Sequence, residues 1–272
     1  HPFHIYSMHQ AIEEGFILNV LQNYMTYKTC FKIANNTPEN PEVPASSASK
    51  VIKKYQQLHP ENIRQKSEII VETFRSTTRT KINGKGKMMV VTASRPAAVL
   101  YFLEIKRYAA EMGYDDVKPM VAFSGEVTLN DETYTESGLN VRPDGSHITE
   151  AQTKQEFHDN FNILIVAEKY QTGFDEPLLH TMIVDKKLRN VKTVQTLSRL
   201  NRTCSGKNDT YVLDFANEAE DVQADFQVFY HETILEEEVN TDLLYKVQKE
   251  LRGFRIYDDQ DIASFCEVYF AK

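Results

Sequence analysis

The sequence predicts an α/β fold in which a parallel sheet is flanked by helices, with a helical region before the sheet and a helical extension after it. Short apolar, β-rich runs recur along the middle of the chain and alternate with helical patterns, as in βαβ units. One run, Phe161–Ala167, is almost continuously apolar, as expected for a parallel strand covered on both faces. Ser94-Arg-Pro96 follows another run and predicts a helix start, because it combines a capping hydroxyl with a first-turn proline.

Helical patterns precede the expected sheet. Residues 5–33 and 50–80 place apolar side chains at roughly 3.6-residue intervals, so each stretch predicts an amphipathic helix. A connection rich in proline and serine lies between them. The glycine-containing segment Lys81–Lys87 predicts a flexible link and a domain boundary. We therefore expect three parts: a helical linker over 1–84, a sheet domain over 85–217 and a helical extension over 218–272.

The elements of the sheet domain follow in order. The helix that begins at Ser94 is expected to stop at Gly113. Thr149-Glu-Ala-Gln152 has capping-box spacing and predicts a second helix that ends near Asn160. The polar stretch 127–147 between these helices is expected to be a surface insertion. Strands are expected over 88–93, 117–123, 161–167, 181–185 and 210–215.

The composition restricts the class of protein. The chain has 272 residues, a formal net charge of −8 at pH 7 and three cysteines. The acidic balance speaks against a protein that simply coats nucleic acid. The odd, widely spaced cysteines argue against a disulfide framework or a zinc site and favour a reducing, cytoplasmic location. We expect no membrane span, since no apolar run reaches about 18 residues, and the missing initiator Met suggests a fragment.

The charge is unevenly distributed along the chain. Basic residues cluster between Lys186 and Lys207, and acidic residues between Glu218 and Glu238. A basic groove on an acidic body would suit contact with DNA or a nucleotide, whereas pairing between the two segments would serve only the fold. Apolar faces in the acidic helices after Phe215 are expected to pack on the sheet domain or on a neighbour.

The most informative stretch is Gln195–Arg202. On a helix, its polar side chains at i, i+3, i+4 and i+7 would form one stripe: Gln195, Ser198, Arg199 and Arg202. A separate apolar stripe would pack on the sheet: Val191, Val194, Leu197 and Leu200. Two guanidinium groups on one face suit a phosphate, because each offers planar paired donors and a permanent charge. The alternative is a solvated basic helix face.

A second informative stretch is the loop 167–177, which follows the buried strand 161–167. Gly173 permits close backbone approach, and Asp175 can fix a hydroxyl or an arginine. The alternative is an ordinary turn with a helix-capping aspartate. Sites in open parallel sheets gather beyond the carboxyl ends of the strands, so this loop and the arginine stretch are expected to face one crevice.

Taken in order, strand-Thr92-Ala-Ser94, Thr172-Gly173-Phe-Asp175 and Gln195-x-x-Ser198-Arg199-x-x-Arg202 resemble motifs IV, V and VI of superfamily 2 helicases and translocases. In that family these motifs lie on the second RecA-like motor domain. The sequence resembles more closely the motor (R) subunit of type I restriction endonucleases, in Tyr6–Leu18, in Gln195–Arg202 and in Tyr211–Phe215 with the acidic run after it.

The resemblance implies roles for individual residues. Arg199 and Arg202 would be arginine fingers that reach the γ-phosphate of ATP, a role worth about 10³–10⁵ in rate in well-studied cases. A second group would lie near the nucleotide: Gln195, Gly173 and Asp175. A third group would contact the DNA backbone through hydroxyls, which bind phosphate without reading bases: Thr92, Ser94 and Thr172.

The resemblance also implies cofactors and partners. The sequence has no G-x-x-x-x-G-K-[ST] phosphate loop and no acidic cluster of the Walker B type. ATP and Mg²⁺ would therefore be bound mainly by a first motor domain outside this chain, and the fragment alone should neither hydrolyse ATP nor cut DNA. The implied partners are double-stranded DNA and the methylation and specificity subunits. Two alternatives remain open: another superfamily 2 helicase acting in DNA repair or on RNA, and a non-catalytic α/β protein-binding module.

Overall fold

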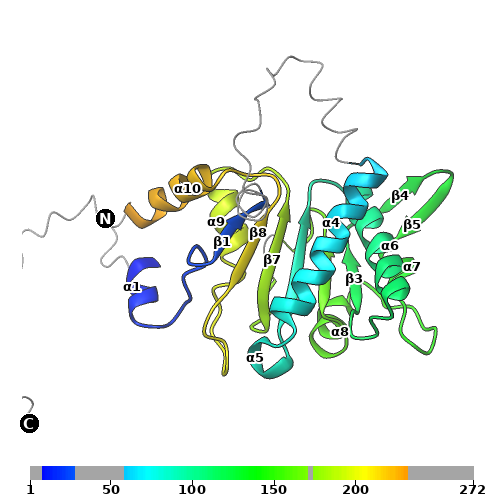
Figure 1. Cartoon of the computed structure of the whole chain (residues 1–272), viewed down its shortest axis with the longest axis horizontal. Coiled ribbons are helices and arrows are strands. Elements are labelled where there is room, and N and C mark those ends of the chain that lie inside the picture. The colour runs from blue at the N-terminus through cyan, green and yellow to red at the C-terminus, as the bar shows by residue number, and fades with distance from the viewer. Residues whose placement is uncertain (1–7, 28–57, 171–173, 232–272) are drawn as a thin grey trace, which may run out of the picture. The chain divides into compact units, whose positions relative to one another are not determined.

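The computed structural model describes residues 8–27, 58–170 and 174–231 (Figure 1). Within them, six strands form one sheet in which every neighbouring pair is parallel. Its strands are β1 (Tyr24–Thr26), β2 (Lys87–Thr92), β3 (Pro119–Ala122), β6 (Ile163–Val166), β7 (Leu179–Asp185) and β8 (Tyr211–Asp214). Their spatial order is β1-β8-β7-β2-β6-β3. The expected parallel sheet flanked by helices is confirmed.

Helices cover the sheet on both faces. Helix α6 (Arg95–Met112) connects β2 to β3 and packs on β2, β3 and β6, and α4 (Pro60–Thr73) packs against α6. The connections that contain α8 (Thr153–Asp159) and α9 (Val191–Leu197) cross the sheet in the opposite direction, so right-handed crossovers put them on the opposite face. The ends of α6 agree with the sequence, since Ser94 Oγ accepts a hydrogen bond from Ala97 N and Gly113 is left-handed at φ 67°.

The expectation of one helix over 5–33 is wrong for the part that the structure describes. Helix α1 spans only Met8–Glu13, and the chain then forms β1, which pairs with β8 at the edge of the sheet. Tyr24 Oη donates to Asp214 Oδ2 at 2.7 Å and ties this edge strand to its neighbour. One strand of the sheet, β1, is thus formed by residues expected to be a helical linker. The domain boundaries at 84/85 and 217/218 stay a prediction.

The expected flexible link at 81–87 is a tight turn. Helix α4 continues into a π-helical turn, η1 (Phe74–Thr78), and then into α5 (Lys81–Gly84), in which Ile82 and Asn83 have positive φ. Gly86 lies so close to the preceding turn that a Cβ there would be 2.2 Å from the carbonyl oxygen of Thr78. Only glycine fits at this position, where the chain enters β2.

The polar stretch 127–147 is more than the surface insertion that was expected. It forms a hairpin of β4 (Glu126–Leu129) and β5 (Glu132–Thr135), followed by α7 (Glu136–Leu139). Two of its polar side chains are buried at 1% exposure, Glu136 and Asn140. The Asn140 amide accepts from Val121 N and donates to Val121 O, so it caps the free edge of β3 as another strand would.

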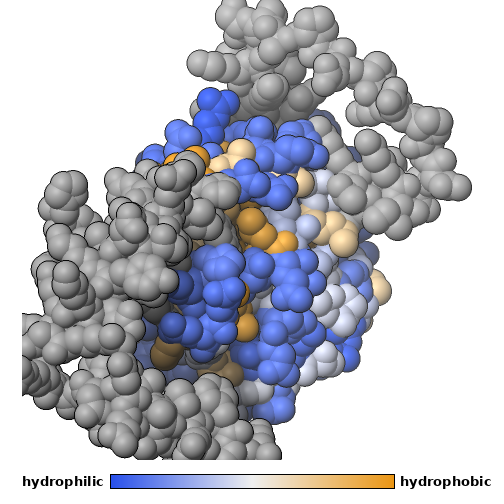
Figure 2. Space-filling model, turned by 90° about the vertical axis from the view of Figure 1, so that its left-hand side faces the viewer, coloured by the Kyte–Doolittle hydropathy of each residue, from blue (hydrophilic) through white to orange (hydrophobic). Residues whose placement is uncertain are grey.

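The final described helix is α10 (Ala219–His231), where Val222 and Phe226 are buried as the expected apolar face requires. The other expected helical face, Leu243–Leu251, lies outside the described residues. Figure 2 shows a largely hydrophilic face with a few small apolar patches. Among the described helices, none combines the length and apolar character needed to cross a membrane.

Candidate functional site

The two candidate arginines lie on a loop. Helix α9 ends at Leu197, with Ser198 as its C-cap, so the expected helical stripe through Gln195, Ser198, Arg199 and Arg202 is wrong. The apolar stripe fits better, since Val194, Leu197 and Leu200 are buried, although Val191 is 48% exposed. Arg202 forms an isolated antiparallel bridge with Ile17.

Beyond the end of α9, groups outside the helix bind the carbonyls that a longer helix would use. In a continued helix, the carbonyls of residues 200–202 would accept from amides four residues later. Here Leu18 N donates to Asn201 O at 2.9 Å. The Lys207 ammonium donates to Leu200 O at 2.8 Å and to Arg202 O at 2.7 Å. Three consecutive carbonyls are thus used by tertiary partners, and the backbone leaves the helix.

The arginine loop lies against the segment that follows residue 173. Arg199 Nη1 donates to the carbonyl oxygen of Phe174 at 3.0 Å, and Arg202 Nε lies 3.2 Å from Asp175 Oδ1. The free thiol of Cys204 donates to Pro177 O at 3.4 Å. The structure therefore brings Asp175 together with two arginines from a later part of the chain, Arg199 and Arg202.

The charges of this cluster suit an anion. The side chains of Arg202 and Asp175 are 57% and 67% exposed, so their ion pair is worth only about 0–1 kcal/mol and an incoming anion can replace Asp175 at little cost. Burial and the nearby positive charge of Arg202 lower the pKa of the Arg199 guanidinium, against the opposing charge of Asp175. A phosphate would relieve the repulsion between the two guanidiniums, and the residues present fit such a group.

The other candidates for nucleotide contact are placed less closely or are not described. Gln195 is exposed near the end of α9. Thr172 and Gly173 lie outside the described residues. The backbone just before them is unusual, because Glu168 and Tyr170 have φ values of 58° and 62°. Positive φ is uncommon for residues with a side chain, and it brings this loop into a sharp turn directly after β6.

The hydroxyl candidates after β2 differ from one another. Thr92 is fully buried, and its hydroxyl donates to Val166 O at 2.9 Å, so the expectation that it contacts DNA conflicts with its position in the fold. Ser94 is half-buried at the N-cap of α6, where Oγ accepts from Ala97 N at 3.3 Å. The Ser94 hydroxyl proton is not used by that bond and can be donated to a phosphate oxygen.

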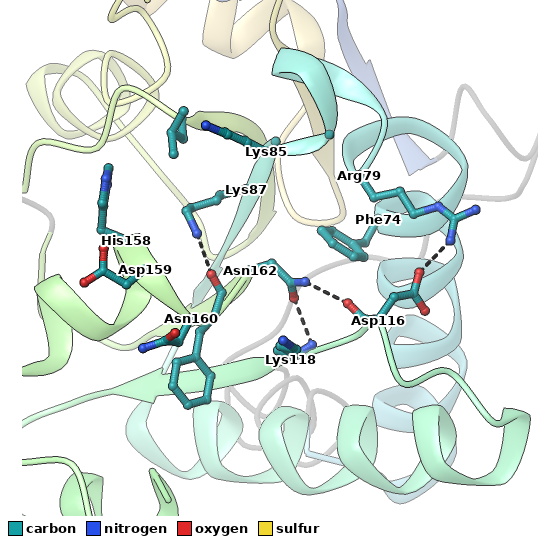
Figure 3. A pocket seen from close by; sticks show the side chains of 14 residues that line it. Phe74, Arg79, Lys85, Lys87, Asp116, Lys118, His158, Asp159, Asn160 and Asn162 are labelled. Carbon is teal, nitrogen blue, oxygen red and sulfur yellow. Dashed lines mark hydrogen bonds and ion pairs between the residues drawn. The ribbon is translucent and has the colours of Figure 1, made fainter. Parts of the chain in front are cut away.

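A pocket of about 550 Å³ opens elsewhere, at the amino ends of β2, β6 and β7 (Figure 3). Its charged side chains bind mainly to the protein itself. The Lys87 ammonium donates to the carbonyls of Phe157 and Phe161 at 2.7 and 2.6 Å, and Arg79 contacts Asp116 at 2.6 Å. None of the described candidate residues lines this pocket. Its size therefore does not identify it with the predicted site.

Sequence reasoning missed two residues that hold the site's surroundings. Lys207 stands in the sequence as the last member of the basic cluster that begins at Lys186, yet it is 5% exposed and binds the backbone of the arginine loop. Glu136 was hidden in a polar stretch, yet it binds Lys169 at 2.8 Å, in the loop after β6. A lysine or glutamate that becomes buried carries no local sequence signal, because its burial depends on how the rest of the chain packs around it.

Comparison with known proteins shows what this chain is similar to. A family model described as Type I restriction enzyme subunit R domain 3 matches residues 145–217. That range contains Asp175, Arg199 and Arg202, together with β6, β7 and β8.

Two curated relatives agree with this match. The type I restriction enzyme HindI endonuclease subunit of Haemophilus influenzae is 25% identical over 182 residues, which cover 62% of this chain and 16% of that protein. The MjaIXP endonuclease subunit assigned to a type I restriction enzyme of Methanocaldococcus jannaschii is 25% identical over 169 residues, which cover 62% of this chain and 15% of that protein. The chain thus spans about 15% of the length of these relatives.

Solved structures with a similar course of the chain include a fragment assigned to the HsdR subunit of a type I restriction enzyme from Vibrio vulnificus YJ016. It has 15% identity and a TM-score of 0.49, and the likeness covers 84% of this chain and 36% of that one. The ATP-dependent type ISP restriction-modification enzyme LlaBIII bound to DNA has 13% identity and a TM-score of 0.45, over 85% of this chain and 15% of that one. The sequence matches confirm the resemblance of this chain to the carboxyl-side part of type I restriction enzyme R subunits, with domain 3 of that subunit matched by residues 145–217.

Proposed function

We propose that this chain supplies the arginine-bearing lobe of an ATP-driven motor that moves on double-stranded DNA within a type I restriction enzyme. The observation that carries the proposal is the cluster of Asp175, Arg199 and Arg202. Two cations beside an exposed, displaceable carboxylate are what an interdomain phosphate site needs. ATP and Mg²⁺ would be held mainly by a first motor domain outside this chain.

Each residue would have a defined task when the lobes close over the nucleotide. Arg202 would leave Asp175 and contact a phosphate oxygen, and Arg199, anchored by Phe174 O, would hold its charge nearby. Positive charge at that point stabilises the charge that develops in phosphoryl transfer. Gln195 and Gly173 would complete the nucleotide side. Opening after hydrolysis would step the lobes along the duplex.

Contacts with DNA would come from hydroxyl groups near the carboxyl ends of β2 and β6. Ser94 and Thr172 remain candidates, because hydroxyl donors bind backbone phosphates without reading bases. Thr92 is not a candidate for this contact, because its hydroxyl donates to the backbone carbonyl of Val166. The methylation and specificity subunits would be partners of the whole enzyme in the cytoplasm, where translocation would be coupled to cleavage. The chain alone would neither hydrolyse ATP nor cut DNA.

The test is DNA-stimulated ATP hydrolysis by the full-length protein. Arg199→Ala and Arg202→Ala should each lower kcat by about 10²-fold or more while ATP binding is retained. Arg107→Ala is the matched control, because Arg107 is also an exposed, carboxylate-paired arginine, at 49% exposure on α6. Unchanged turnover in folded Arg199 and Arg202 variants would refute the arginine-finger role.

A further inference from the structure

We propose that Lys207 is a positioning residue that fixes the loop carrying Arg199 and Arg202. Its ammonium donates to Leu200 O at 2.8 Å and to Arg202 O at 2.7 Å, so it binds backbone on both sides of Asn201. The expected effect on ATP hydrolysis rests on the proposed role of the arginines, whereas the contact between Lys207 and the loop does not.

The surroundings of Lys207 explain why it has this task. The side chain is 5% exposed, and burial lowers its pKa to about 8. A buried lysine needs hydrogen-bond acceptors, and here two carbonyl oxygens accept from two of its three N–H groups. The turn at Gly206, with φ 83°, returns the chain and places the side chain beneath the arginine loop.

The Lys207 ammonium shares the task of holding the loop backbone with Leu18 N, which donates to Asn201 O at 2.9 Å. The amides of Arg199, Leu200 and Asn201 donate in short-range turns, at 3.3, 3.0 and 3.4 Å. Loss of the ammonium would leave two acceptor carbonyls without their donor. The backbone that carries the two arginines would then be held less firmly, although the contacts with Ile17 and Leu18 would remain.

The chain contains a matched control in Lys87. Its ammonium is also buried, at 6% exposure, and also donates to two carbonyls, those of Phe157 and Phe161. Burial lowers the pKa of Lys87 as well. Lys87 and Phe161 line the pocket of Figure 3, and neither of the two carbonyls belongs to the arginine loop. Lys87→Met therefore reproduces the structural loss without touching the arginines.

The first measurement is hydrogen exchange over residues 198–204 in the full-length protein. Lys207→Met keeps the length and apolar stem of the side chain and removes the donors. It should speed exchange in this segment by about 10-fold, the factor expected when buried acceptors lose their donor. Lys87→Met should leave exchange there unchanged. Lys207→Gln, which keeps amide donors, should give a smaller increase and serves if the methionine variant does not fold.

The second measurement is kcat for DNA-stimulated ATP hydrolysis, calculated per protein molecule that binds nucleotide. Lys207→Met should lower kcat by about 10-fold in the wild-type background, and Lys87→Met should change it less than about 2-fold. In an Arg199→Ala/Arg202→Ala background, Lys207→Met should have no additional effect, because it acts through the arginines. An additive loss, or unchanged exchange at 198–204, would overturn the positioning role. If the double arginine variant keeps full kcat, the proposed function fails, and the exchange result alone upholds or overturns the contact of Lys207 with the loop.

Discussion

Replacing Glu136 by glutamine should destabilise the protein strongly, although the side chain changes little in shape. The carboxylate is 1% exposed and accepts three hydrogen bonds, from Phe123 N at 2.9 Å, Thr153 Oγ1 at 2.7 Å and Lys169 Nζ at 2.8 Å. These donors come from the end of β3, from α8 and from the loop after β6. One carboxylate therefore joins three segments of the fold.

The magnitude follows from what remains after the substitution. Breaking a buried ion pair by removing one partner costs about 3–5 kcal/mol. Lys169 is 16% exposed and keeps its bond to Glu150 at 2.7 Å, which reduces the cost. The glutamine amide also replaces one acceptor oxygen by an NH2 group, which then faces one of the three donors that the carboxylate had bound. We expect a loss of about 3 kcal/mol in the free energy of unfolding, at the lower end of that range.

Equilibrium urea unfolding of the wild type and the variant measures this loss. Glu150→Gln is the matched control, because Glu150 binds the same ammonium but is 58% exposed. Its loss should be about 0–1 kcal/mol. Adding Lys169→Met to Glu136→Gln should recover part of the loss, since the only charge then left without its partner is the solvated carboxylate of Glu150. A loss below about 1 kcal/mol for Glu136→Gln would refute the reasoning that this buried carboxylate holds the fold together.

Two further predictions concern stability. Gly86→Ala should lower the free energy of unfolding by at least about 3 kcal/mol, because its Cβ would lie 2.2 Å from Thr78 O. Gly113→Ala should lower it by about 1–2 kcal/mol, because only its φ of 67° is unfavourable. Equal shifts in Tm for the two variants would contradict this difference. Burial lowers the pKa of His180 from 6.5 against the hydrogen bond with Asp209, so the folded protein holds the ring neutral where the unfolded chain protonates it. The free energy of unfolding should therefore fall as the pH drops below about 6.5, and His180→Gln should reduce that dependence in urea unfolding at a series of pH values.

The parts of the fold that follow from local chemistry were predictable from the sequence. Helix α6 begins at a serine cap and ends at a left-handed glycine, and both signals are written within a few residues of the helix ends. The buried strands β2, β6 and β7 are recognisable in the sequence by their apolar runs. Their alternation with helices requires a parallel sheet, because successive parallel strands need crossover connections.

The parts that depend on remote partners were not predictable. Strand β1 is three residues long, and it is a strand only because β8 offers it an edge. Glu136 and Asn140 read as surface residues, because polarity along the chain says nothing about which side chains a tertiary contact will bury. The candidate residues Asp175, Arg199 and Arg202 were identified by their spacing in sequence, and the helix assumed for the arginines was not required for that identification.

The end of α9 connects the fold with the proposed chemistry. The apolar pattern of Val194, Leu197 and Leu200 would allow the helix to continue, so helical periodicity alone gives no stop signal. Beyond the stop, the carbonyls of residues 200–202 each accept from Leu18 N or from the Lys207 ammonium, so they are not available to a longer helix. A helix would point both arginines along one rigid axis and bury their carbonyls in its own bonds. A loop held from below by a lysine instead exposes Arg202 beside a displaceable Asp175 and anchors Arg199 on Phe174 O. Under the proposed function, the contacts that hold this loop would prepare the two guanidiniums for a ligand that arrives from outside this domain.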